Sequence, residues 1–207
     1  AEIERGNPLA IGCILGGHGI SGWGGTSKVC AANSGRIFGT AERFINDNGR
    51  PDPCGAVLPG YEPLPEEERY ALAARLAPVI RGMASTDRRM VGHLTDSNVV
   101  LDFLSRERHR ELAALGTSCP DHFLRTKVRP MVLDLPPSSP IAEIEARLHE
   151  LHEQYRSEYA AYYARWATPE SPPMRGADPA IVLVPGVGMF SFGANKQTAR
   201  VAGEFYL

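Results

Sequence analysis

The sequence predicts an α/β fold, a layered sheet with helices on both faces. Short apolar runs alternate with segments of helical periodicity along the whole chain. One of these runs, residues 9–17, is short and continuously apolar, which is typical of a strand covered on both faces. The 207 residues, 43% of them hydrophobic and 22% charged, suffice for a buried core of ordinary globular composition.

The bulk properties exclude several classes of function. A formal net charge of −2 gives no electrostatic reason to expect nucleic acid or an anionic membrane as partner. No apolar run approaches the roughly 20 residues of a membrane helix, and no signal-peptide pattern is present. The four scattered cysteines predict reduced thiols and a cytoplasmic protein. The start at Ala1, within what resembles the tail of a helix, suggests a piece of a longer protein.

The first part of the chain predicts a strand, a glycine turn and a second short strand, followed by a helix. Thr26 or Ser27 can cap this helix, which we expect to end near Asn48. Residues 49–63 hold four prolines and three glycines, which is typical of a linker. We therefore predict one lobe over residues 1–62 and a second small α/β lobe over residues 63–207.

The second lobe repeats the alternation of helices and strands. The expected elements are, in chain order, a helix from Pro65, a strand within 88–94, a helix capped by Asp96 or Ser97, a strand over 122–135, a long helix over 138–167, and a final strand–turn–strand–helix from 181.

His18 is the first candidate for chemistry, because it stands in a glycine turn directly after a strand. Ligand crevices of α/β sheets open beyond strand ends, so the position suits a metal ligand or a base. A histidine that hydrogen-bonds the turn backbone is the alternative. His149 and His152 lie among glutamates on the long helix, and we expect a solvated face there.

A basic stretch is the second candidate. Alternation over residues 122–129 places Arg125, Lys127 and Arg129 on one face of the expected strand. Phosphate or sugar-acid binding is one interpretation, and a charged edge strand that discourages sheet pairing is the other. Just before it, Asp121 could orient His122 or cap a turn.

Two phrases of the sequence align without gaps, "GCILGGHGISGWGGTSK" (12–28) and "IVLVPGVGMFSFGANKQ" (181–197). Gly17, Gly19 and Gly24 fall on Gly186, Gly188 and Gly193, and His18 falls on Val187. Both coincidence and two related lobes remain open as explanations. A dinucleotide loop in the second phrase is rejected, because Ser191 stands where the third glycine of the fingerprint would be.

The stretch "ILGGHGISGWG" resembles the class II aldolase/adducin family, in which a strand ends in a His-Gly pair. Three longer stretches, "GTSCPDHFLRTKVRPMVLDLP", "SPPMRGADPAIVLVPGVGMFSFG" and "KQTARVAGEFY", resemble the bifunctional rhamnulose-1-phosphate aldolase/short-chain alcohol dehydrogenase proteins. The resemblance covers essentially the whole chain. It implies that this chain starts midway through an aldolase region and stops before a dehydrogenase region.

The resemblance also implies chemistry. In such aldolases three histidines bind a zinc ion that stabilises an enediolate, and His18 matches the third of them. The other ligands, the acidic proton-transfer residue and the phosphate-binding residues would lie upstream, and the NAD(P) site downstream. Gly25 stands where an aspartate is usual. The implied parent reaction is retro-aldol cleavage of a ketose 1-phosphate, with the isolated chain inactive.

Two further functions remain open from the residues. The second lobe could be a non-catalytic connecting or oligomerisation module, and a homo-oligomer is expected. Alternatively, it could bind a small-molecule sugar phosphate through Arg125, Lys127 and Arg129.

Overall fold

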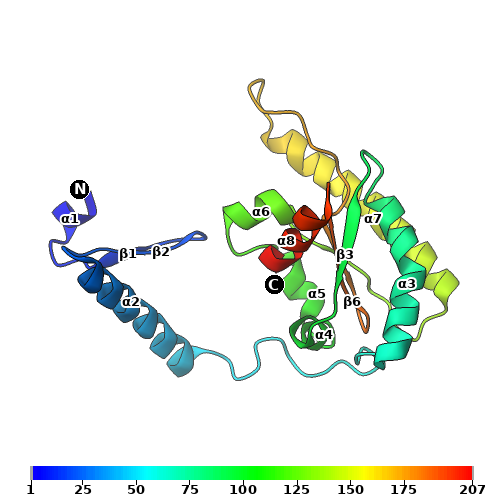
Figure 1. Ribbon diagram of the computed structural model, residues 1–207, viewed down its shortest axis with the longest axis horizontal. Helices are drawn as coiled ribbons and strands as arrows, with labels where there is room; N and C mark the ends of the chain where they lie inside the picture. The colour runs from blue at the N-terminus through cyan, green and yellow to red at the C-terminus, as the bar shows by residue number, and fades with distance from the viewer. Residues whose placement is uncertain (1, 207) are drawn as a thin grey trace. The chain divides into compact units, whose positions relative to one another are not determined.

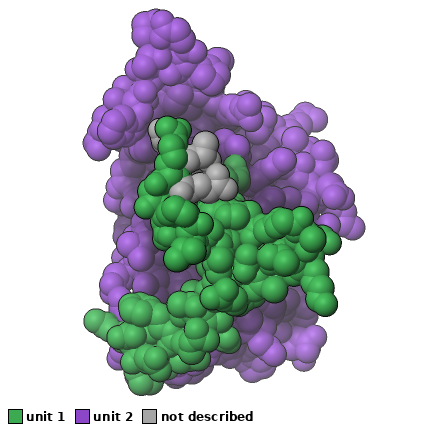
Figure 2. All heavy atoms as spheres, turned by 90° about the vertical axis from the view of Figure 1, so that its left-hand side faces the viewer, with its two compact units in different colours: residues 1–53, 118–121 green, residues 54–117, 122–207 purple. Residues whose placement is uncertain are grey.

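The computed structural model describes residues 2–206. These fall into two compact units, which are described separately below and coloured separately in Figure 2. The first comprises residues 1–53 and 118–121, and the second comprises residues 54–117 and 122–207. The boundary predicted after residue 62 stays a prediction.

The first unit is built around one hairpin and one long helix. It contains α1 (Glu2–Gly6), β1 (Gly12–Leu15), β2 (Gly19–Gly22) and α2 (Ser27–Asn48). Strands β1 and β2 pair antiparallel and form a two-stranded sheet. Thr26 is the residue that caps α2, because its side chain accepts a hydrogen bond from the Val29 N–H. The predicted strand–turn–strand–helix order is confirmed here. The expectation that the first strand is covered on both faces is wrong within residues 2–206, because Ile14 and Leu15 of β1 are 70% and 46% exposed.

The second unit holds a mixed four-stranded sheet in the order β3-β6-β5-β4. Figure 1 shows the neighbours β3 and β6 side by side. Strand β6 pairs antiparallel with both β3 and β5, whereas β4 runs parallel to β5. The elements of this unit are, in chain order, α3 (Glu66–Met83), β3 (Val91–Thr95), α4 (Asn98–Leu104), α5 (His109–Ala114), α6 (Pro120–Thr126, which begins in the first unit), β4 (Met131–Val132), α7 (Ile141–Trp166), β5 (Ile181–Val184), β6 (Gly188–Gly193) and α8 (Lys196–Tyr206).

Helices cover both faces of this sheet, as predicted. Val182 and Val184 of β5 pack with residues of α3 and α7, whereas Ile181 and Leu183 pack with residues of α4, α5 and α8. All four of these strand residues are at most 1% exposed. Successive side chains of β5 therefore point alternately into two apolar clusters, one on each side of the sheet.

The two aligned phrases adopt the same strand–turn–strand–helix structure, one in each compact unit. Leu15 pairs with Gly19 as Val184 pairs with Gly188, and the pairing continues in step along both hairpins. The turn glycines share their unusual backbone, with φ of 66° at Gly17 and 72° at Gly186, then 140° at Gly19 and 139° at Gly188. These values favour glycine, which explains the matched spacing.

The match extends into the helices. Thr26 caps α2 through the Val29 N–H, and Asn195 accepts a hydrogen bond from the Thr198 N–H at the start of α8. In both units a serine lies against a glycine where the second strand of the hairpin packs on the following helix. In the first unit the glycine is on the strand, and in the second unit it is on the helix. Gly22 of β2 lies against Ser34, whereas Ser191 of β6 lies against Gly203. This agreement in register, turn, cap and packing favours two related lobes over coincidence.

The strand predicted over residues 122–135 is wrong in its basic part, residues 122–129. Residues 120–126 form α6, and only Met131 and Val132 are extended as β4. Pro120 and Asp121 suit the first turn of a helix, and eight residues of alternation are too few to decide between strand and helix. The basic side chains therefore do not share a strand face.

The expectation of a solvated face at His152 is also wrong. His152 is 8% exposed, whereas His149, three residues earlier on α7, is exposed. The helix turns this histidine toward Asp178, as described below. Within residues 2–206, no helix has both the length and the apolar character to cross a membrane.

Candidate functional site

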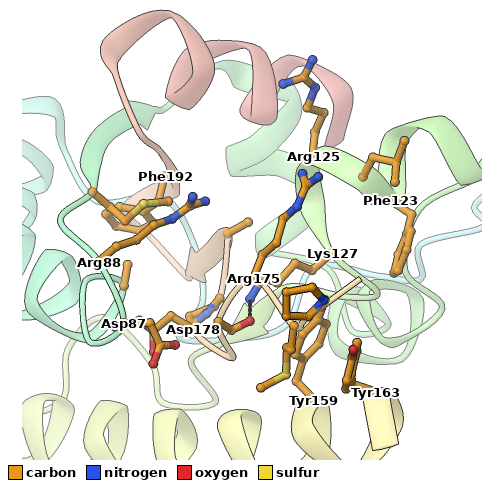
Figure 3. Close-up of a pocket in the computed structure, with 18 of the residues that line it drawn as sticks. Asp87, Arg88, Phe123, Arg125, Lys127, Tyr159, Tyr163, Arg175, Asp178 and Phe192 are labelled. Atoms are coloured by element: carbon orange, nitrogen blue, oxygen red, sulfur yellow. Dashed lines mark hydrogen bonds between the residues drawn. The ribbon is translucent and has the colours of Figure 1, made fainter. Parts of the chain in front are cut away.

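A pocket of about 480 Å³ in the second unit is the strongest candidate site. This is the size range of small-molecule sites in proteins. The aromatic rings of Phe123, Tyr159, Tyr163 and Trp166 line it together with charged side chains. In Figure 3, Tyr159 and Tyr163 rise from α7, and Arg88, Arg125 and Arg175 lie farther from that helix.

Lys127 is the most unusual residue of the pocket. It follows the last turn of α6, where its N–H donates to the Phe123 carbonyl at 2.9 Å. Its φ is +64°, and no other non-glycine residue among the described residues has a positive φ. Glycine is the usual residue at this position after a helix, because a Cβ is strained there. Non-glycine residues held in this conformation are concentrated at functional sites.

The side chain of Lys127 is held over an aromatic ring. Its Nζ lies 4.2 Å from the centroid of the Tyr159 ring and donates a hydrogen bond of 2.8 Å to the Gly176 carbonyl. Burial lowers the pKa of Lys127 to about 8, although the nearby carboxylates of Asp178 and Asp87 act in the opposite direction. A lysine with this pKa in a pocket is a candidate functional group.

The two acids beside Lys127 are already engaged by other groups. Asp178 accepts hydrogen bonds from the N–H groups of Thr86 and Asp87, contacts His152 Nε2 at 3.2 Å and pairs with Arg156. Asp87 accepts from Arg156 at 3.1 Å and from the Ala177 N–H at 2.9 Å.

The hydrogen bond from Arg156, followed by that from the Ala177 N–H, holds the pKa of Asp87 below its usual range. Both carboxylates therefore already have hydrogen-bond partners, namely side chains of α7 and backbone N–H groups.

The remaining charge of the pocket is positive. Arg88, Arg125 and Arg175 line it with no acidic partner among the side chains that the structure describes. With Lys127 they provide four cationic side chains, against two carboxylates that share their pairing with Arg156. Guanidinium groups bind phosphate and carboxylate oxygens by charge-assisted hydrogen bonds. The pocket therefore favours an anion beside aromatic surface.

The structure separates the residues singled out from the sequence. Arg125 and Lys127 both line the pocket, whereas Arg129 pairs with Glu158 of α7. The His122 ring packs against Phe205 at 4.9 Å between centroids.

His18 lies in the turn of the β1–β2 hairpin in the first unit. Its Nδ1 is 3.8 Å from Asp121 Oδ2, with both side chains more than half exposed. Sequence reasoning missed Asp87, Arg88, Arg156, Arg175 and Asp178, which come from segments far apart in the chain.

We expect Lys127 to titrate near pH 8. The chain has three lysines, so reductive methylation with ¹³C-formaldehyde gives few dimethyl-lysine NMR signals to assign. One signal should have a midpoint near pH 8 and be absent from the Lys127→Arg variant. The unfolded pKa is 10.5, so the contribution of Lys127 to stability increases as pH rises from about 8 to 10.5. A Lys127 midpoint above pH 10 would contradict the prediction.

Comparison with known proteins adds the family. The family model described as "Aldolase class II, second domain" matches residues 71–207. A protein of Bacillus subtilis (strain 168) named "Uncharacterized oxidoreductase YuxG" is 32% identical over 208 residues. That similarity covers 100% of this chain, which spans 30% of the length of that relative. No solved structure matches the chain.

Proposed function

Because the chain belongs to the family of class II aldolase second domains, we propose that it acts as part of a class II aldolase–oxidoreductase fusion protein. The proposed reaction is retro-aldol cleavage of a ketose 1-phosphate of the rhamnulose-1-phosphate type into dihydroxyacetone phosphate and an aldehyde. A short-chain NAD(P)-dependent dehydrogenase would form another part of the same protein. The family match over residues 71–207 is the observation that carries the proposal, and the similarity to a longer protein named an oxidoreductase supports it.

Zinc is the proposed metal of the aldolase reaction, but the described residues do not by themselves fit a zinc site. A zinc site needs at least three protein ligands, and residues 2–206 contain no group of three His, Cys, Asp or Glu side chains placed to hold a metal. We assign His18, exposed in its turn, as one ligand of a site that other residues complete. No catalytic step is derived through this metal.

The test uses the natural full-length gene product. Cleavage of rhamnulose 1-phosphate is followed by the NADH consumed when glycerol-3-phosphate dehydrogenase reduces dihydroxyacetone phosphate. We expect the His18→Ala variant to lose one ligand of the site, with bound zinc and cleavage both falling at least about tenfold. The matched control is His149→Ala, which changes an exposed histidine of α7 and should leave both unchanged. Full zinc content in the His18→Ala variant would contradict the role of His18.

Anion binding by the pocket of the second unit is a second candidate function. The position of Lys127 favours a phosphate or carboxylate ligand, as do the guanidinium groups of Arg125 and Arg175, which have no acidic partner within the described part of the chain. It would hold the phosphate of a sugar phosphate against the aromatic side chains. This candidate and the aldolase proposal are compatible, because the pocket and His18 belong to different units.

Calorimetry of the chain with inorganic phosphate tests this candidate. Arg125→Ala and Arg175→Ala should each weaken binding by about tenfold, since each removes a charge-assisted hydrogen bond. Affinity should also fall as pH rises through about 8, where Lys127 loses its charge. Arg165→Ala is the control, because Arg165 is an exposed arginine of α7 outside the pocket lining. Equal affinities in all variants would contradict an anion site here.

A further inference from the structure

The β1–β2 hairpin has the same structure as the β5–β6 hairpin, but the two hairpins have different neighbouring strands. In the second unit, β3 pairs antiparallel along β6 and β4 pairs parallel along β5. Within residues 2–206, β1 and β2 have no other strand beside them. Both outer edges of the first hairpin are therefore open.

Matched side chains differ sharply in exposure. Ile14 is 70% exposed, whereas its counterpart Leu183 is 1% exposed. Leu15 is 46% exposed and its counterpart Val184 is 1% exposed. Strand residues of this type are normally buried, and a hydrophobic hairpin with open edges is a template for strand addition.

The backbone hydrogen bonds also indicate that the outer edges of the first hairpin are open. Leu183 accepts a hydrogen bond from the Leu133 N–H just after β4, and the matching carbonyl in the first unit belongs to Ile14. In the first hairpin, the Trp23 N–H donates to the Ile11 carbonyl. The alternation of an antiparallel pair then turns the N–H groups of Ile14 and Ile20 toward the open edges.

We propose that the β1–β2 hairpin is a docking surface for two β-strands from the rest of the full-length protein. One strand would pair antiparallel along β2, as β3 does along β6, and the other parallel along β1, as β4 does along β5. The similar Bacillus subtilis protein is long enough to supply such strands, because this chain spans 30% of it. The inference rests on the repeat and does not depend on the proposed reaction.

A second copy of this chain fits the surface less well. A two-fold symmetric pair places β1 against another β1 in antiparallel orientation. The counterpart of β1, which is β5, instead has a parallel neighbour. The repeat therefore favours a strand from elsewhere in the same polypeptide.

Hydrogen–deuterium exchange tests the proposal on residues 1–207 and on the natural full-length gene product. The amides of Ile14 and Ile20 should exchange at least about 100-fold more slowly in the full-length product than in residues 1–207 alone. Those of Leu183 and Met189 should be protected in both, because their strands already have neighbours on both sides. Equal rates at Ile14 and Ile20 in the two proteins would overturn the proposal.

A pair of variants gives a second measurement. Ile14→Asp should lower the melting temperature of the full-length product by several degrees and leave that of residues 1–207 unchanged. Leu9→Asp is the control, because Leu9 is 88% exposed and precedes β1, and it should change neither protein. If residues 1–207 sediment as a dimer that Ile14→Asp dissociates, the occupant is a second copy and the proposal is wrong.

Discussion

Replacing Asp178 by alanine is expected to lower the free energy of unfolding of the second unit by about 3–5 kcal/mol. The side chain of Asp178 is 9% exposed and binds Arg156, His152 and two backbone N–H groups. Its loss removes one of the two carboxylates that pair with Arg156 and leaves His152 and the N–H groups of Thr86 and Asp87 without this acceptor, which costs far more than losing a surface pair. Urea unfolding followed by far-UV circular dichroism measures the change.

Asp102→Ala is the matched control for Asp178. Asp102 also pairs with an arginine, Arg106, but its side chain is 58% exposed, so the expected loss is below about 1 kcal/mol. Asp178→Asn keeps the size of the side chain and isolates the effect of its charge. A loss at Asp178 no larger than that at Asp102 would show that the buried network does not stabilise the fold.

Gly186→Ala is expected to destabilise the second unit by about 3 kcal/mol. The φ of Gly186 is +72°, where a Cβ adds about 1–2 kcal/mol of strain. That Cβ would lie 2.5 Å and 2.6 Å from two ring carbons of Pro137, and such overlap adds about 1–3 kcal/mol. The same urea measurement applies.

The control for Gly186 is Gly60→Ala in the same unit. Gly60 has a φ of +84°, but no atom lies within 4 Å of the position of its Cβ. Only backbone strain remains, so about 1 kcal/mol is expected. Similar losses in the two variants would show that contact with Pro137 contributes nothing.

The elements with strong local signals could be predicted from the sequence. The strand expected at the start of the second phrase forms as β5 over Ile181–Val184. The predicted cap at Thr26 or Ser27 is confirmed at Thr26, and the long helix expected over 138–167 spans Ile141–Trp166. Each of these features depends on residues close together in the chain, so a local pattern suffices.

The helix at residues 120–126 was missed because two local signals conflict there. Alternation over a few residues favoured a strand, whereas Pro120 and Asp121 are typical of the first turn of a helix. The helix places Lys127 at its end in a strained backbone, with Arg129 turned to Glu158. Arg125 and Lys127 therefore line the same pocket because they lie at the end of α6, and not because they share a strand face.

The pocket itself could not be predicted, because its groups meet only after folding. Asp87 and Asp178 line the pocket from two separate loops, and Arg156, which pairs with both of them, lies on α7 far away in the chain. His152 was interpreted from its glutamate neighbours on α7, but its environment is set by Asp178 across the unit. Long-range contacts of single polar residues leave no periodic signal in a sequence.

Val187 and His18 occupy matching turn positions in the two hairpins, but their surroundings accept different side chains. Its N–H donates to the Val184 carbonyl just as the His18 N–H donates to the Leu15 carbonyl, so the two backbones accept either residue. Val187, however, is fully buried in the core, whereas His18 is exposed.

An imidazole at position 187 would need a buried hydrogen-bond partner, so a Val187→His substitution should destabilise the core. The packing around the second hairpin therefore favours an apolar residue at position 187, whereas the exposed turn of the first hairpin accepts a polar one.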